Sequence, residues 1–179
     1  MSIRENIELL RRSVPENVKI VAVSKFHPVE QIREAYDGGQ RIFGESRVQE
    51  LVAKQAVLPD DIEWHFIGTL QRNKVKYIAP FIRLIHSLDS ESLMSEIDKR
   101  AVENNRIIPC LLQIHIARET TKSGFAPQEC TDFLAGGRWR NYPHVQLSGV
   151  MGMATLTDDA EQIRSEFRLL RSLFDECKR

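Results

Sequence analysis

The sequence predicts an α/β protein with a parallel sheet, because strand-like and helix-like segments alternate along almost the whole chain. Short runs of β-branched and apolar residues recur, and each is followed by a segment with apolar residues at helical spacing. Glycine and proline residues separate many of these segments. One leading helix and six strand–helix units account for the 179 residues. Such alternation implies parallel strands joined by helical crossovers.

The predicted strands share a high content of valine, isoleucine, leucine and phenylalanine. They cover residues 19–24, 41–44, 62–68, 81–88, 107–116 and 145–153. The first of them, "KIVAVS", carries the chain inward and ends beside Lys25, a residue type that is rarely fully buried unless it is paired or chemically used.

The helices are predicted from apolar spacing and from start and stop residues. The leading helix, residues 3–13, places Ile3, Ile7 and Leu10 on one face. Pro28 occupies the first turn of the next helix, and Gly38 follows its end. The helices after the leading one are expected at residues 28–37, 46–57, 71–79, 90–104, 127–134 and 158–177. In the last helix the residues at helical spacing are Ala160, Ile163, Phe167, Leu170 and Phe174.

Two architectures fit this alternation. One is a doubly wound open sheet. The other is a TIM-type (β/α) barrel, which needs eight units in typically about 250 residues. Six units are two short of a complete barrel, so either the sheet is open or the chain is a truncated barrel. Both folds place the ligand at the carboxyl ends of the strands.

The composition is that of an ordinary globular protein, with 42% apolar and 28% charged residues. The net charge is zero, with 25 basic and 25 acidic side chains, which argues against a nucleic-acid-binding protein. No apolar run approaches the roughly 20 residues that cross a bilayer, and the charged N-terminus lacks an apolar signal segment. We therefore expect a cytoplasmic protein without a membrane partner. The three cysteines have neither zinc-site nor disulfide spacing.

Polar residues gather just after the predicted strands. They include Lys25, Glu45, Ser46 and Asp89. His65 lies within the third predicted strand, and the apolar Met151 lies near the end of the sixth. A desolvated lysine at a strand end can act as a neutral nucleophile that forms Schiff bases with carbonyl compounds. This chemistry serves class I aldolases and pyridoxal phosphate (PLP) proteins. None of the five histidines is paired as a metal ligand set, so no metal site is expected.

Several stretches together resemble one family. In chain order they are "VAVSKFHP", "GQRIFGESRVQEL", "IEWHFIGTLQRNKVKYI", "HSLDS", "KSGF" and "LSGVMGM". They are similar to the YggS/PROSC-type PLP homeostasis proteins, and the similarity covers about residues 20–153. The resemblance implies a fold-type III PLP barrel, like the N-terminal domain of alanine racemase. It also implies a protein that binds PLP without established turnover and that buffers the cofactor or delivers it to PLP-dependent apoenzymes.

The resemblance also implies roles for individual residues. Lys25 matches the family lysine that holds PLP as a Schiff base. His65 and Met151 match positions that line the cofactor pocket. Ser46 replaces the asparagine of the family's Gly-Glu-Asn motif, which leaves a shorter hydroxyl near the cofactor.

The family pattern continues with two further motifs, "GMS-x-D" and "G-S-T-x-V-R-I-G", which are absent from these 179 residues. The resemblance assigns them the last two strands, most phosphate-binding groups and the arginine facing the pyridine nitrogen. We therefore expect a single barrel domain, residues 1–179, that lacks two β-α units and holds PLP weakly or not at all. The first and sixth strands would have free edges, which favours self-association.

Two other functions remain open from the sequence. An aldolase-like enzyme would need an acid or base near the lysine, for which Glu45 and Asp89 are candidates. A ligand-free protein that only makes interactions is the other alternative.

Overall fold

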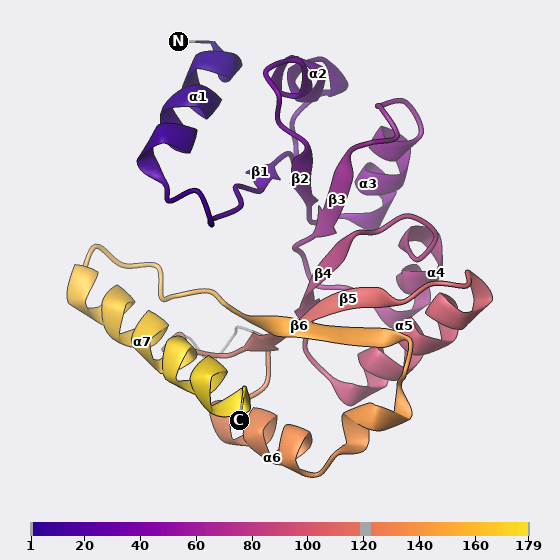
Figure 1. Ribbon diagram of the computed structural model, residues 1–179, viewed down its shortest axis with the longest axis vertical. Coiled ribbons are helices and arrows are strands. Elements are labelled where there is room, and N and C mark those ends of the chain that lie inside the picture. The colour runs from indigo at the N-terminus through magenta and orange to yellow at the C-terminus, as the bar shows by residue number, and fades with distance from the viewer. Residues whose placement is uncertain (1, 119–122, 179) are drawn as a thin grey trace.

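The computed structural model describes residues 2–118 and 123–178, and these form one six-stranded parallel sheet with helices packed along it (Figure 1). Lys122 of the "KSGF" stretch lies outside the described residues. The strands are β1 (Ala22–Val23), β2 (Ile42–Glu45), β3 (Glu63–Phe66), β4 (Leu84–Leu88), β5 (Ile108–Ile114) and β6 (Val145–Gly152). The helices are α1 (Ile3–Ser13), α2 (Val29–Asp37), α3 (Val48–Gln55), α4 (Val75–Ile78), α5 (Glu91–Glu103), α6 (Pro127–Ala135) and α7 (Ala160–Cys177).

The strand order decides between the two predicted architectures. It is β1-β2-β3-β4-β5-β6, so each strand pairs with the next one in the chain. A doubly wound sheet reverses direction at a switch point, whereas a barrel adds strands in sequence order. The open doubly wound alternative is therefore wrong, and the barrel-type order is confirmed. Within the described residues β1 and β6 are the two edge strands.

The first strand is shorter than predicted. Residues 19–24 were expected to be extended and paired, but only Ala22 and Val23 pair with β2. Before the paired segment the buried Gln40 side chain joins the two strands, because its amide donates to the carbonyl oxygens of Ile20 at 2.8 Å and Ile42 at 2.7 Å. A side chain thus bridges the two strands where the backbone ladder stops.

Some helices also differ from the prediction. The helix expected at 71–79 is divided into a 3₁₀ turn, η1 (Arg72–Lys74), and the single-turn helix α4. A second 3₁₀ helix, η2 (Arg138–Asn141), was not predicted. On α7 the expected apolar position Phe167 is 45% exposed, while its neighbour Glu166 is buried. Glu166 is buried because it binds the loop that precedes its own helix.

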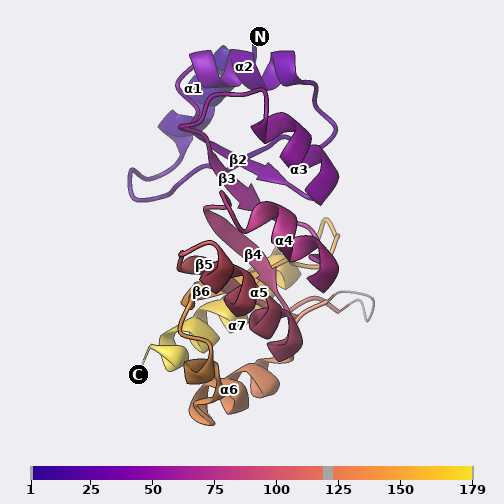
Figure 2. The same cartoon turned by 90° about the vertical axis from the view of Figure 1, so that its right-hand side faces the viewer.

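The core lies between the sheet and the helices along its outer side. Figures 1 and 2 show α3, α4 and α5 along this side, with α1 beside the β1 edge and α7 beside the β6 edge. The core includes the large side chains Phe43, Trp64, Phe66, Ile85 and Phe133. Residues in register share a face of a parallel sheet. Val23, Gly44 and His65 are in register and lie on the inner face, opposite the face that the helices cover.

At the carboxyl end of β6 the chain enters α7 through a loop fixed by Glu166. Its carboxylate accepts hydrogen bonds from the Thr155 backbone N–H and hydroxyl, both at 2.7 Å. Asp159 caps the N-terminus of α7 by accepting from the N–H groups of Glu161 and Gln162. Helix and loop are therefore joined locally at this edge of the sheet.

Candidate functional site

Lys25 lies just beyond the carboxyl end of β1, on the rim where a barrel carries its site. Its side chain is exposed, and its Nζ lies 6.0 Å from the centroid of the Phe26 ring. Within the part of the chain that the structure describes, this amine has neither an ion pair nor a hydrogen bond. The expectation that burial removes water from Lys25 is wrong, because β1 is an edge strand and Val23 beside it is 50% exposed.

The backbone next to Lys25 has an unusual conformation. Phe26 has a φ of 65°, in the left-handed region that a bulky residue adopts only when its surroundings enforce it. Its N–H donates to Glu50 Oε1 at 2.7 Å, and the Arg47 guanidinium lies 4.8 Å from its ring centroid. Both of these contacts come from the segment that begins α3, so the loop carrying Lys25 is held by a different strand–helix unit.

Behind this loop lies a buried charged cluster that we call the Lys54 network: Lys54, Glu45, Glu50 and Ser24. Lys54 Nζ lies 2.7 Å from Glu45 Oε1, 2.6 Å from Glu50 Oε1 and 2.7 Å from the Ser24 carbonyl oxygen. Lys54 is 6% exposed and Glu45 is fully buried. Sequence reasoning missed this network. The available signal was the Glu50–Lys54 spacing of four residues directly after a strand that ends in Glu45.

Two histidines meet on the inner face of the sheet. His65 Nδ1 lies 2.9 Å from His86 Nε2, so one ring donates a hydrogen bond to the other. Burial lowers the pKa of His65 to about 4, and the neighbouring His86 contributes to that shift. Burial also lowers the pKa of His86. Both imidazoles are therefore neutral at pH 7, and they form a polar but uncharged surface beside the rim.

Ser46 follows β2 and is half-buried against the end of β3. A Cβ atom built on Gly68 would lie 2.3 Å from the Ser46 carbonyl oxygen and 2.7 Å from its Cα. Only a glycine at position 68 allows the two strand-end loops to approach this closely. Gly68 therefore permits the close backbone approach of the predicted site residue Ser46.

Met151 lies on β6 and is half-buried. It is in register with Gln113 of β5, and β5 and β6 pair along the length of both strands. Following the register across the sheet places Met151 on the inner face together with His65. No hydrogen bond joins Lys25, Ser46, His65 and Met151 to one another within the described ranges. Of the four, His65 and Met151 are placed on one face by strand register, while Lys25 and Ser46 follow the carboxyl ends of β1 and β2.

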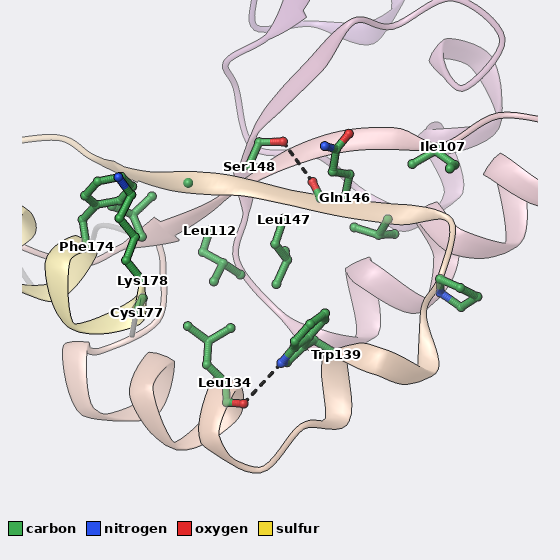
Figure 3. A pocket seen from close by; sticks show the side chains of 14 residues that line it. Ile107, Leu112, Leu134, Trp139, Gln146, Leu147, Ser148, Phe174, Cys177 and Lys178 are labelled. Atoms are coloured by element: carbon green, nitrogen blue, oxygen red, sulfur yellow. Dashed lines mark hydrogen bonds between the residues drawn. The ribbon is translucent and has the colours of Figure 1, made fainter.

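A further groove lies elsewhere. It has a volume of about 750 Å³ and is bounded by β6, by α6 with η2, and by α7. Figure 3 shows Leu112 and Leu147 facing Leu134 and Trp139 across it, with Phe174 at one end. The Trp139 indole N–H donates to the Leu134 carbonyl oxygen at 3.2 Å. None of the four predicted site residues lines this groove, which belongs to the helix side of the sheet.

Glu45, a candidate acid or base for an aldolase, does not face the rim as a free carboxyl group. Its Oε1 binds Lys54 and the Ser24 hydroxyl, the latter at 2.6 Å. Asp89 accepts a hydrogen bond from Ser90 at 3.1 Å.

Among the described residues no group of three or more metal-ligating side chains is positioned to hold an ion. None of the described helices has the length and apolar character needed to cross a membrane.

Comparisons with known proteins agree with this fold. The profile of the family described as "Alanine racemase, N-terminal domain" matches residues 1–179. A pyridoxal phosphate homeostasis protein of Aquifex aeolicus (strain VF5) is 41% identical over 162 residues, which span 90% of this chain and 70% of that protein. The structure of PipY from Synechococcus elongatus PCC7942 without PLP is 37% identical, with a TM-score of 0.92. The structure with PLP bound is 36% identical, with a TM-score of 0.88, and both alignments cover 99% of this chain and 82% of PipY.

Proposed function

The chain belongs to the family of the alanine racemase N-terminal domain and to the pyridoxal phosphate homeostasis proteins, and from this membership we propose that it binds PLP and takes part in PLP homeostasis. Lys25 is the attachment point, and Ser46, His65 and Met151 line the cofactor site. The observation that carries this assignment is an exposed amine without an ionic partner among the described residues, held at the carboxyl end of β1.

The residues present fit the proposed ligand. PLP combines an aldehyde, a flat aromatic ring and a phosphate, and it supplies the aldehyde that captures a primary amine and the ring that withdraws electrons. Attachment forms a C=N bond between Lys25 Nζ and the aldehyde carbon and releases water. The neutral His65 offers an uncharged imidazole and Met151 a polarizable thioether to the ring, while the Ser46 hydroxyl supplies a hydrogen-bonding group.

We infer a carrier or buffering role rather than an enzymatic one. Turnover at a lysine-bound carbonyl needs an acid or base within hydrogen-bond reach of the nitrogen. In the described ranges no carboxylate contacts the Lys25 amine, and Glu45 is fully buried, with Oε1 bound to Lys54 and Ser24 and Oε2 without a hydrogen-bond partner. These contacts favour a cofactor-binding protein over an aldolase-like enzyme.

The location and partners follow as further parts of the proposal. Cys110, Cys130 and Cys177 are free thiols, which suits the reducing cytoplasm. PLP-dependent apoenzymes would receive the cofactor. The edge strands β1 and β6 offer backbone groups for self-association of the barrel-type domain.

The test is spectroscopic. Purified protein mixed with PLP is expected to develop the visible absorbance of a lysine-bound cofactor, and Lys25→Ala is expected to abolish that band. Lys74→Ala is a control, because Lys74 is another lysine, in η1 between β3 and α4, with its Nζ 5.7 Å from the centroid of the Tyr77 ring. Borohydride reduction followed by peptide mass spectrometry should place the pyridoxyl group on Lys25.

Other outcomes point to the alternatives. Labelling mainly at Lys74 would overturn the assignment of Lys25. Trapping of a small carbonyl substrate on Lys25 with release of a product would favour the aldolase-like enzyme. A folded protein that acquires no PLP band at any cofactor concentration would favour the ligand-free interaction protein.

A further inference from the structure

Lys54 is an unusual residue because it is a buried lysine that is ion-paired with two carboxylates. Its side chain is 7% exposed, and Nζ has three oxygen partners at 2.6–2.7 Å. These partners match the three protons of an ammonium group. Removing a charge from water costs several kcal/mol unless partners of this quality compensate for it. Burial of Lys54 therefore depends on these three oxygen partners, and the Lys54 ammonium group in turn holds their positions.

The partners of Lys54 lie on both sides of Lys25. Lys54 binds the Ser24 carbonyl oxygen directly, and this oxygen belongs to the peptide unit that joins Ser24 to Lys25. Lys54 also binds Glu50 Oε1, which accepts the Phe26 N–H. That N–H belongs to the peptide unit that joins Lys25 to Phe26. Both peptide planes that flank the Lys25 Cα atom are thus anchored to one ammonium group.

Two flanking planes determine where a side chain points. The φ and ψ angles of Lys25 are the rotations between these planes, so fixing both planes fixes the direction of the Cα–Cβ bond. The remaining contacts reinforce the arrangement. Ser24 N–H donates to the Gly44 carbonyl oxygen at 2.9 Å, and the Ser24 hydroxyl donates to Glu45 Oε1. The left-handed Phe26 is kept in its strained conformation by the same Glu50.

The charges of the network also fit together. The hydrogen bond from Lys54 lowers the pKa of Glu50. One ammonium group thus faces two carboxylates in a region where β1, β2 and α3 meet. Because α3 supplies both Glu50 and Lys54, the loop after β1 is positioned by the helix of the next strand–helix unit, β2–α3.

We propose that Lys54 is a positioning residue for Lys25: through Ser24 directly and through Glu50 and Phe26, it aims the Lys25 amine at the aldehyde of its ligand. This inference rests on the proposed function, since it assigns Lys25 as the attachment point. Lys54 itself does not touch the ligand and acts only through the backbone around Lys25.

The experiment distinguishes an effect on the position of Lys25 from an effect on folding by using variants that remove single hydrogen-bonding groups. Glu50→Ala removes the acceptor of the Phe26 N–H but leaves the contacts of Lys54 with Glu45 and Ser24. Glu50→Gln restores an oxygen acceptor at the same place. Glu30→Ala is the matched control, because Glu30 is an exposed glutamate in the first turn of α2. Lys54→Met removes the whole network. Circular dichroism and thermal melting identify the variants that are folded.

The readouts are the apparent Kd for PLP from the visible band and the distribution of pyridoxyl label among lysines after borohydride reduction. Glu50→Ala is expected to raise the Kd about tenfold, the effect of one hydrogen bond to a charged acceptor. Glu50→Gln is expected to lie within about threefold of the parent protein. A folded Lys54→Met is expected to raise the apparent Kd about 10²-fold, the effect of a misplaced reacting group. It is also expected to shift the pyridoxyl label from Lys25 to other lysines.

The results can be told apart from a failure of the proposed function. If the parent protein carries no pyridoxyl group on Lys25, the proposed function fails first. If the parent is labelled on Lys25 and folded Glu50→Ala has the Kd and label distribution of Glu30→Ala, the positioning role is overturned. Should Lys54→Met not fold, the comparison of the three glutamate variants decides the question alone.

Discussion

The loops after the two edge strands, β1 and β6, are each anchored by a buried charged side chain, but the two anchors differ in reach. Lys54 of α3 holds the loop after β1 by donating to the Ser24 carbonyl oxygen. Glu166 of α7 holds the loop after β6 by accepting from the Thr155 N–H and hydroxyl. The sequence separations are 30 residues for the first contact and 11 residues for the second.

The two edges of the sheet therefore differ in how many elements their anchoring contacts join. The Lys54 network joins β1, β2 and α3, so the conformation around Lys25 depends on the assembled sheet. The hydrogen bonds from Thr155 to Glu166 join a helix to the loop directly before it, and the Thr155 hydroxyl also accepts from the Arg118 N–H after β5 at 3.0 Å. We expect the β1 edge to respond strongly and cooperatively to loss of its anchor, and the β6 edge to respond moderately and locally.

The largest effect is expected from Lys54→Met. Removal of one partner leaves Glu45 as a buried uncompensated charge, so the free energy of unfolding should fall by about 3–5 kcal/mol. Urea denaturation followed by circular dichroism measures the loss. Lys99→Met, at an exposed position of α5, is the matched control and should change stability by less than about 0.5 kcal/mol. Equal losses in the two variants would show that the network does not stabilise the β1 edge.

A smaller effect is expected from Glu166→Gln. The amide keeps the size of the side chain but weakens charge-assisted hydrogen bonds from Thr155 and Gln162, which should lower the unfolding free energy by about 1–3 kcal/mol. Glu161→Gln is the control, since its carboxylate is on the surface and pairs with Arg164. Hydrogen exchange should increase mainly in residues 153–160. Exchange that increases equally around β1 would contradict a local anchor.

In the middle of the sheet, unlike at the two edges, we expect a histidine to make the stability depend on pH. The pKa of His65 is about 4 in the folded protein, below the ordinary value of 6.5. The unfolded chain therefore binds more protons than the folded protein below pH 6.5. The stability that the neutral His65 contributes is fully present above pH 6.5 and is lost as pH falls toward 4. Between pH 7 and pH 5 the unfolding free energy should decrease by about 1–2 kcal/mol.

His65→Gln tests that pH dependence, because it removes the titrating ring but leaves a hydrogen-bonding side chain for His86. Its stability should fall less steeply between pH 7 and pH 5 than that of the parent. His27→Gln is the control, since His27 is exposed and bonded to Gln31. Parallel pH curves for the parent and His65→Gln would rule out a contribution from this ring.

The smallest effect concerns the thiols near the β6 edge. Burial raises the pKa of the Cys130 thiol to about 12 and also raises that of Cys110. Cys177, at the end of α7, is exposed. A thiol reagent at pH 8 is expected to label Cys177 alone in the folded protein, as peptide mass spectrometry would show. Rapid labelling of Cys130 would mean that α7 separates readily from α6, and that this edge is looser than its packing indicates.

Much of the fold could be predicted from local patterns. Pro28, the Gly38-Gly39 pair and the apolar spacing of Leu93, Met94 and Ile97 depend on neighbours within a few residues, and the corresponding helices are present. The short β1 could not be predicted, because the Gln40 side chain replaces part of its backbone pairing. The exposure of Phe167 could not be predicted either, because helical spacing does not show that Glu166 has a loop to bind.

The sequence by itself determined the α/β class and the placement of Lys25 at the end of the first strand, because both follow from short-range periodicity and from the residues that end each strand. Only the tertiary structure decided that the strands run in barrel order, that His65 meets His86, and that Lys54 rather than Lys25 is the buried lysine. These features join residues about 20 to 30 positions apart. Their partners are set by the packing of strand–helix units, which no local pattern of charge or hydrophobicity specifies.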